Sequence, residues 1–209
     1  RVRSSAASDV YKRQVLLIMD EEKTRAEVAH IEFISYGTSR IFDRRMRSLD
    51  WKRKVVTFLG VFVPLMIGCA VLSFGLEAPF LPLCITIAGV ASIMQLGFSL
   101  WSLVSGWDRS YSDCMASVKE NTAIYNLAGS VRKKIGKLDE AKLEILIDDL
   151  TEKFERREQE DLTLCVSDKE LRYANRMSCF YFKKKCHICN VVPLTLKPGK
   201  CVCDGCGKF

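Results

Sequence analysis

The chain has 209 residues, of which 48% are hydrophobic and 27% are charged, and its formal net charge is +7. Its mean hydropathy of +0.04 is close to zero, but the apolar residues are concentrated in two long runs, so this average does not indicate a uniformly soluble domain. With two histidines and no nucleotide-binding glycine loop, H-E-x-x-H motif or nucleophile elbow, the sequence does not predict an enzyme.

The first residues of the chain raise a question of origin. Residues 4–14, SSAASDVYKRQ, precede the first methionine, Met19, and can be encoded by a DNA string that resembles a transposase-based sequencing adapter. We expect residues 1–14 to be an artefact of sequence assembly. Like an expression tag, they are given no weight in predicting the fold or the function. A natural disordered arm is the alternative. Without residues 1–14 the net charge falls from +7 to +4, so the rest of the chain is only mildly basic.

The stretch from residue 15 to residue 54 predicts amphipathic helices ahead of the first apolar run. Val28, Ile31 and Ile34 recur at helical spacing, and Tyr-Gly-Thr-Ser at 36–39 predicts a break between two helices. We expect the basic residues nearest the apolar run to lie along lipid headgroups, which attract each of them by about 1 kcal/mol. These residues are Arg44, Arg45, Arg47, Lys52, Arg53 and Lys54.

Residues 55–107 predict a transmembrane hairpin with helices at about 55–76 and 80–106, since neither apolar run contains a charged residue. A helix needs about 20 such residues to cross a bilayer core. Apolar residues all round, rather than a stripe, argue against two buried helices of a globular protein. The link Glu77-Ala78-Pro79 is short enough only for a tight turn. Basic residues lie before the first run and none lies in the link, so the positive-inside rule places both termini in the cytoplasm.

A small and polar face runs along the second predicted span. Ser92, Gln95, Ser99 and Ser102 fall on one side of a helix that turns about 100° per residue. This face could line a water-filled path in an oligomer, or it could allow two helices to pack closely. With no charge in either span, proton relays and charged-substrate transport lack their usual signature.

Residues 108–166 predict cytoplasmic helices that continue from the second span. A 4-3 spacing is kept by Trp107, Tyr111, Cys114, Val118, Asn121, Tyr125 and Ala128. This spacing predicts a coiled-coil-like seam in which Asn121 could fix register or oligomeric state, and the alternative is a helix folded back on its own N-terminal neighbours. Gly136 is expected to end this helix.

The next helix has an apolar face with Leu146, Leu150 and Phe154. The run 152–161, EKFERREQED, is expected to form a solvated charged face. Ser167 and Glu170 have the spacing of a capping box, so a last helix should begin there.

The C-terminal part of residues 167–209 predicts a small zinc-ribbon-like module. Two Cys-x-x-Cys pairs separated by thirteen residues can hold one tetrahedral zinc ion at about 2.3 Å from each sulfur. The metal would supply folding energy to a segment with no core, and a reducing cytosol argues against disulfides. The predicted ligands of structural Zn²⁺ are Cys186, Cys189, Cys203 and Cys206, with Cys201 as a possible substitute for Cys203.

Three neighbouring features complete the module. Gly205 and Gly207 are expected to allow turns with positive φ, and His187 is expected to point away from the metal. The run 180–185, FYFKKK, interleaves aromatic residues with lysines. It could contact nucleic acid or rest on anionic lipid, and nucleic acid is the weaker prediction.

Several of these features together resemble a known group. The two apolar runs, the stretch 96–127, LGFSLWSLVSGWDRSYSDCMASVKENTAIYNL, and the terminal double CxxC resemble bacterial SLATT-like two-helix membrane proteins, in particular the group described as mobilome CxxCx(11)CxxC proteins. The resemblance covers roughly residues 40–209. In that pattern eleven residues separate the pairs; here eleven separate Cys189 from Cys201, but Asp204 stands where the second pair would be completed.

The resemblance implies a mobile-element context and, for SLATT proteins generally, a proposed role as pore-forming effectors in defence against phage. We therefore expect a mainly α protein of the bacterial inner membrane, homo-oligomeric, that perturbs the bilayer or forms a pore under control of its zinc-binding end. The alternative is a membrane-anchored adaptor whose zinc module binds a cytoplasmic protein or nucleic acid, with no pore.

Overall fold

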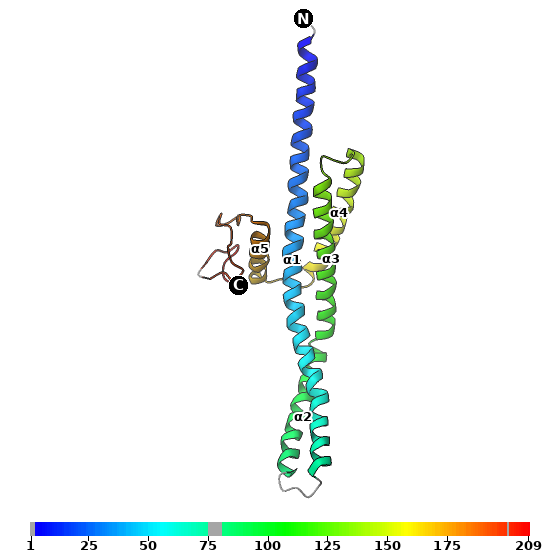
Figure 1. Ribbon diagram of the computed structural model, residues 1–209, viewed down its shortest axis with the longest axis vertical. Helices are drawn as coiled ribbons and strands as arrows, with labels where there is room; N and C mark the ends of the chain where they lie inside the picture. Colours follow the sequence, from blue (N-terminus) through cyan, green and yellow to red (C-terminus); the bar gives the residue numbers. More distant parts are fainter. Residues whose placement is uncertain (1–2, 75–80, 200) are drawn as a thin grey trace. The chain divides into compact units, whose positions relative to one another are not determined.

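The computed structural model describes residues 3–74, 81–199 and 201–209, with side chains from residue 21 onward apart from Ala70, Val71, Phe74, Leu81 and Cys84. These residues form five α-helices and no strand (Figure 1): α1 Arg3–Phe74, α2 Leu81–Val104, α3 Trp107–Lys134, α4 Glu140–Leu162 and α5 Asp168–Phe182. The expected helical fold class is confirmed. The predicted turn at Glu77-Ala78-Pro79 lies outside the described residues, and the prediction for residues 1–14 stays a prediction.

The chain divides into two compact units, which are described separately. The core unit comprises Arg1–Phe42 and Ala116–Phe209, and the hairpin unit comprises Asp43–Met115. The core unit therefore contains the start of α1, most of α3, and all of α4 and α5. The hairpin unit contains the rest of α1, all of α2 and the start of α3.

The predicted break at residues 36–39 is wrong, because α1 continues through it. A Cβ added to Gly37 would lie 2.7 Å from Ser178 Oγ and 3.2 Å from the carbonyl oxygen of Ala174. Both of these residues belong to α5. Gly37 thus allows the close approach of α5 to α1 and does not form a turn. Ser39 Oγ donates a hydrogen bond to the Tyr36 carbonyl at 2.7 Å, so its hydroxyl is paired within α1.

The predicted continuation of the second apolar helix into the next is also wrong. Helix α2 ends at Val104 and α3 begins at Trp107. Gly106 has φ +61°, a left-handed conformation that glycine adopts easily at the end of a helix. The two later boundaries are confirmed: α3 ends at Lys134, with Gly136 at φ +78°, and α5 begins directly after Ser167.

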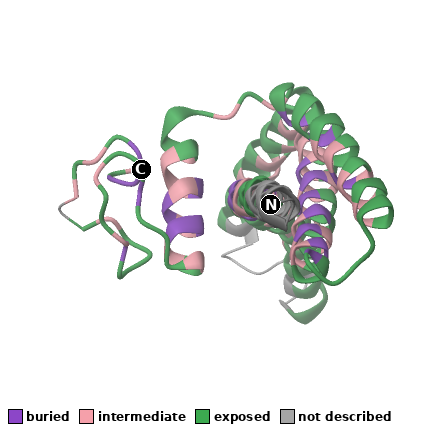
Figure 2. Ribbon diagram, turned by 90° about the horizontal axis from the view of Figure 1, so that it is seen from above, coloured by how far each residue is buried: buried purple, intermediate pink, exposed green. Residues whose placement is uncertain are grey.

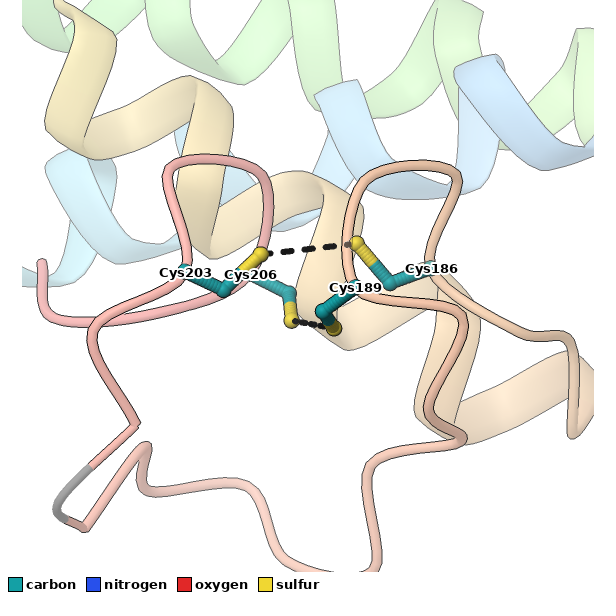
Figure 3. Close-up of side chains that lie close together, drawn as sticks. All are labelled: Cys186, Cys189, Cys203 and Cys206. Atoms are coloured by element: carbon teal, nitrogen blue, oxygen red, sulfur yellow. Dashed lines mark hydrogen bonds between the residues drawn. The ribbon is translucent and has the colours of Figure 1, made fainter.

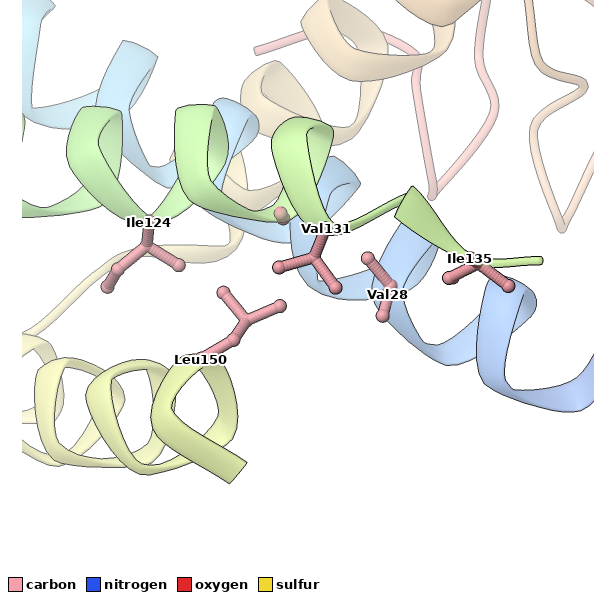
Figure 4. Packing of buried hydrophobic residues seen from close by; sticks show 6 residues of the cluster. Val28, Ile124, Val131, Ile135 and Leu150 are labelled. Carbon is pink, nitrogen blue, oxygen red and sulfur yellow. The ribbon is translucent and has the colours of Figure 1, made fainter. Parts of the chain in front are cut away.

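Helices α1, α3 and α4 pack around the apolar core of the core unit. Its buried residues come from these three helices and from Ile135, which directly follows α3 (Figure 4): Val28, Ile124, Ala128, Val131, Ile135 and Leu150. Each fully buried side chain of this size contributes about 1.5–3 kcal/mol through removal from water. Helix α3 therefore folds back on its own N-terminal neighbour, the alternative that the sequence left open.

A buried polar network joins α3 to α4. Asp161 accepts hydrogen bonds from Ser117 Oγ and Asn121 Nδ2, both at 2.7 Å, and from Arg157 Nε at 2.9 Å. Arg157 and Asp161 are buried, so the prediction of a wholly solvated face over 152–161 is wrong at these two positions. Buried charges persist where they are paired and hydrogen-bonded, and Asn121 finds its partner within the same chain.

Candidate metal centre and helix hairpin

Each cysteine pair lies on a tight turn of the same construction. The backbone N–H of Asn190 donates to the Cys186 carbonyl at 2.8 Å, and that of Gly207 donates to the Cys203 carbonyl at 2.7 Å. Asn190 has φ +56°, a conformation that asparagine tolerates better than most residues. In both turns, the residue after the second cysteine thus closes a loop over the first.

The expected positive φ at Gly205 and Gly207 is wrong, since among the described glycines only Gly106, Gly136 and Gly199 have it. These two glycines supply room instead. A Cβ on Gly207 would lie 2.3 Å from the Cys203 carbonyl oxygen, and one on Gly205 would lie 3.1 Å from Cys186 Sγ. The second turn therefore needs a residue without a side chain at Gly207, and Gly205 allows close packing of Cys186 and Ile188.

The two turns bring four sulfur atoms together (Figure 3). The Sγ atoms of Cys186, Cys189, Cys203 and Cys206 all lie within 4.8 Å of one another. Cys186 Sγ lies 3.9 Å from Cys203 Sγ, and Cys189 Sγ lies 3.6 Å from Cys206 Sγ. Four ligands at about 2.3 Å from one tetrahedral ion are about 3.8 Å apart, whereas a disulfide brings sulfurs to about 2.05 Å. The arrangement fits a tetrahedral metal ion such as zinc.

Cys201 lies outside this group of four. It packs against the small cluster formed by Cys179, Cys186 and Cys206, and its backbone N–H donates to the Pro198 carbonyl at 3.0 Å. The fourth sulfur of the group is therefore that of Cys203 rather than that of Cys201. His187 is exposed and is not among the grouped ligands.

The surroundings of the sulfurs favour a bound cation. The Gly205 N–H donates to Cys203 Sγ at 3.3 Å and lowers the pKa of that thiol to about 7. Burial raises the pKa of Cys206, because a lone thiolate is poorly solvated there. A divalent cation among the four sulfurs would offset this cost and hold them as thiolates.

Two residues of α5 that the sequence did not single out hold the module in place. Arg176 is 5% exposed, and its guanidinium donates to the carbonyls of Cys206 at 2.9 Å, Thr195 at 3.0 Å and Lys197 at 3.0 Å. Asn175 Nδ2 donates to the Gly205 carbonyl at 2.7 Å. Backbone carbonyls accept all of these bonds, so no motif in the sequence reveals them.

Helix α5 joins the module to α1 through aromatic contacts. The rings of Tyr36 and Tyr181 stack with centroids 4.3 Å apart, and the hydroxyls of Tyr125 and Tyr181 lie 2.9 Å apart. Ser178 Oγ donates to the Phe33 carbonyl at 2.9 Å. Phe182 packs against Tyr36 and Phe33 as well. The rings of Tyr181 and Phe182, two of the three aromatic residues in FYFKKK, therefore pack against other residues of the chain. They are not free to stack on bases, which weakens the nucleic-acid prediction.

The basic residues ahead of the hairpin form contacts of their own. Arg47 pairs with Asp43 at 3.0 Å, Lys54 pairs with Asp50 at 2.6 Å, and Arg53 pairs with Asp108 at 2.6 Å. The guanidinium of Arg53 also lies over the Tyr111 ring at 4.5 Å, and the Lys52 ammonium lies over the Trp107 ring at 5.6 Å. Arg44 is exposed and Arg45 is half-buried. Arg53 and Lys52 therefore link the end of the basic stretch to the start of α3.

The polar face of α2 is turned toward α1 within the hairpin unit. Ser92, Gln95, Ser99 and Ser102 are half-buried. With its amide oriented so that both ends are paired, Gln95 donates to the Leu59 carbonyl at 3.3 Å and accepts from the Gly60 N–H at 3.2 Å. Ser99 and Ser102 line an open pocket of about 700 Å³ together with Asp50, Arg53 and Asp108. Within one hairpin, the polar face thus contacts the backbone of α1 through Gln95.

Large apolar side chains cover the opposite face of α2. Ile93 and Val104 are 72% and 82% exposed. Within the described residues, one helical segment, Ile85–Val104, is long and apolar enough to cross a membrane. The other predicted span, 55–76, ends among residues outside the described part of the chain, so it stays a prediction.

Comparison with known proteins places these features in a family. A family model described as Mobilome CxxCx(11)CxxC protein matches residues 25–209. No curated protein and no solved structure gives a match. The matched region contains both cysteine pairs, but thirteen residues lie between Cys189 and Cys203, so the connecting loop is two residues longer than the family description implies.

Proposed function

The chain belongs to the mobilome CxxCx(11)CxxC protein family, and we propose that it is a membrane-anchored adaptor encoded by a bacterial mobile element. The hairpin unit would hold the protein in the inner membrane with both termini in the cytoplasm. The metal-stabilised end of the core unit would bind a partner protein. Zinc is the proposed ion, because four cysteine sulfurs at tetrahedral spacing suit it best.

The observation that carries the proposal is the distribution of side chains on α2. Its polar residues face α1, while large apolar residues such as Ile93 and Val104 face outward. This pattern is the reverse of that in a water-soluble hairpin. It suits an environment of lipid, in which small and polar residues pack between helices and apolar residues meet the acyl chains.

The packing of the polar face favours the adaptor over the pore. Gln95 is paired with the backbone of α1 at Leu59 and Gly60, so it is already satisfied inside one hairpin. A lumen lined by Ser92, Gln95, Ser99 and Ser102 would require the two helices to separate first. In the adaptor, these residues have only the packing role.

A pore-forming or membrane-perturbing effector is the second candidate, and one observation favours it. The row of polar residues continues through the centre of α2, and its last two members, Ser99 and Ser102, line the pocket. If oligomerisation or a partner separated the hairpin helices, this stripe would be available to water. The metal-bearing end would then regulate the separation.

Membrane association is tested by expressing the full chain in bacteria and washing the membranes with alkaline carbonate. The protein is expected to stay in the membrane pellet, and its release into the wash would overturn the anchored function. A membrane-potential dye then separates the two candidates. An adaptor leaves the potential unchanged on expression, and replacement of Ser92, Gln95, Ser99 and Ser102 by alanine leaves its partner binding intact.

A further inference from the structure

The loop that joins the two cysteine pairs presents apolar side chains to solvent. Leu194 and Val202 are 86% and 89% exposed. Three further large apolar residues of the same region are exposed: Ile188, Val191 and Leu196. Such a concentration of exposed apolar side chains on a small module is characteristic of an interaction surface. We call residues 183–209 the module surface.

The module surface is also strongly basic. It contains six lysines and one aspartate. Lys185, Lys197 and Lys208 are exposed, so they border the apolar residues without taking part in the packing of the module. A partner that fits this surface must therefore combine exposed apolar residues with negative charge.

Helix α4 combines one exposed apolar residue with negative charge. Between Glu140 and Leu162 it contains nine acidic and four basic residues. Ile145 is 68% exposed, and the exposed residues Asp148 and Glu152 follow it at positions i+3 and i+7 on the same side of the helix. The apolar face of α4 is used in the core, so this outward face is a second, separate surface, which we call the α4 face.

The two surfaces cannot meet within one chain. In the core unit, α5 and the cysteine-bearing loops lie on one side of α1, and α3 and α4 lie on the other (Figure 2). The net charge of the module surface is +5 and that of α4 is −5. Equal and opposite charges on opposite sides of one unit suit contact between successive copies.

We propose that the module surface of one chain binds the α4 face of a second copy of this chain. The contact is heterologous, because it joins two different surfaces, and repeated contacts of this kind close into a ring when the rotation between copies permits. The proposal rests on the adaptor function proposed above, and it names a second copy of the chain as the partner of the metal-bearing end.

The test uses the full chain in detergent micelles and compares two charge-reversed variants by mass photometry. The module variant is K185E/K197E/K208E, and the α4 variant is D148K/E152K/E155K, in which Glu155 is the next exposed acidic residue on the α4 face, at i+3 from Glu152. Each variant alone is expected to weaken self-association about tenfold or more, because its own two surfaces now repel. A mixture of the two is expected to associate again, since each module surface then meets an α4 face of opposite charge.

The control variant, K119E/K133E, reverses two exposed lysines of α3 and should associate as the wild type does. Unchanged helix content by circular dichroism and one metal ion per chain show that the variants fold. The proposal is overturned if either reversed variant associates as the wild type does, or if mixing them fails to restore association. Carbonate washing of the same variants measures membrane anchoring independently. A result that overturns the self-association proposal while the variants stay in the membrane pellet therefore contradicts only that proposal and not the anchored function.

Discussion

Arg176 Nη1 donates a hydrogen bond to the carbonyl of the metal-site residue Cys206 at 2.9 Å. The same guanidinium bonds to the connecting loop at Thr195 and Lys197. One side chain of α5 thereby links the second cysteine turn to the loop that leads into it. The metal site and α5 form one structural element, although the site itself lies in a segment with no regular secondary structure.

Replacement of Arg176 by alanine is expected to destabilise the protein by about 2–4 kcal/mol, because the buried carbonyl of Cys206 and the part-buried carbonyls of the connecting loop lose their donor at once. Urea unfolding of the metal-loaded protein measures this. The control is Arg172→Ala, since Arg172 is half-buried and its Nε donates to the Lys208 carbonyl at the chain end. A loss of less than about 1 kcal/mol for Arg176→Ala would contradict the role given to this residue.

The metal ligands are distinguished by two single substitutions. Cys203→Ser is expected to lower bound zinc from one equivalent per chain and to unfold the module, because it removes one of four ligands. Cys201→Ser should keep the full equivalent, since Cys201 lies outside the sulfur cluster. Elemental analysis after dialysis measures both. Loss of zinc from Cys201→Ser and not from Cys203→Ser would reverse the assignment.

Removal of the metal by a chelator is expected to release the C-terminal segment while the core of α1, α3 and α4 stays folded. The reason is that the module has no apolar core beyond the cluster around its cysteines. Hydrogen exchange should therefore rise over residues 183–209 and stay low around Val131 and Leu150, which are buried in the core. Equal protection with and without chelator would show that the module folds without metal.

The contact between α5 and α1 at Gly37 predicts a coupled pair of substitutions. Gly37→Ala places a Cβ 2.7 Å from Ser178 Oγ, so the Ser178 side chain or α5 must shift, and a loss of about 1–3 kcal/mol is expected from overpacking. Ser178→Ala in the same chain removes that oxygen and should recover part of the loss. Thermal unfolding of both single variants and the double variant gives the coupling. Additive losses would mean that the two residues do not meet.

The pair of tyrosine hydroxyls predicts a pH dependence. The hydrogen bond between Tyr125 and Tyr181, followed by burial, raises the pKa of Tyr125 from 10 to about 12. Since the folded state keeps the phenol protonated, its contribution is complete below about pH 10 and is lost as the pH rises toward about 12. Tyr181→Phe should reduce this loss, measured as the fall in unfolding free energy between pH 9 and pH 12 relative to the wild type. Identical pH profiles would exclude the coupling.

Local patterns in the sequence predicted much of the fold. The capping box at Ser167 and Glu170 begins α5 as expected, and Glu170 Oε2 accepts from the Ser167 N–H at 2.9 Å. The glycine at 136 follows the end of α3, and the apolar positions of α4 face the core. Each of these depends on interactions within a few residues, so periodicity and capping rules suffice to find them.

The grouping of two cysteine pairs was predictable from the sequence, because two-residue spacing within each pair is a geometric requirement of a tetrahedral ion. The choice between Cys201 and Cys203 depends on how the thirteen-residue loop returns to the first turn. That return is set by Arg176 and Asn175, which bond to the backbone from another element. No local pattern contains this information.

The helices that local spacing defines, the two cysteine pairs and the apolar segments can be read from the sequence alone. The tertiary structure shows which glycines serve turns, as Gly106 does, and which serve the close approach of two helices, as Gly37 does. It also decided that Arg157 and Asp161 of a charged run are buried and that the polar face of α2 packs against α1. The physical reason is that burial and close contact depend on residues distant in sequence, whereas propensity and spacing act within a few turns of helix.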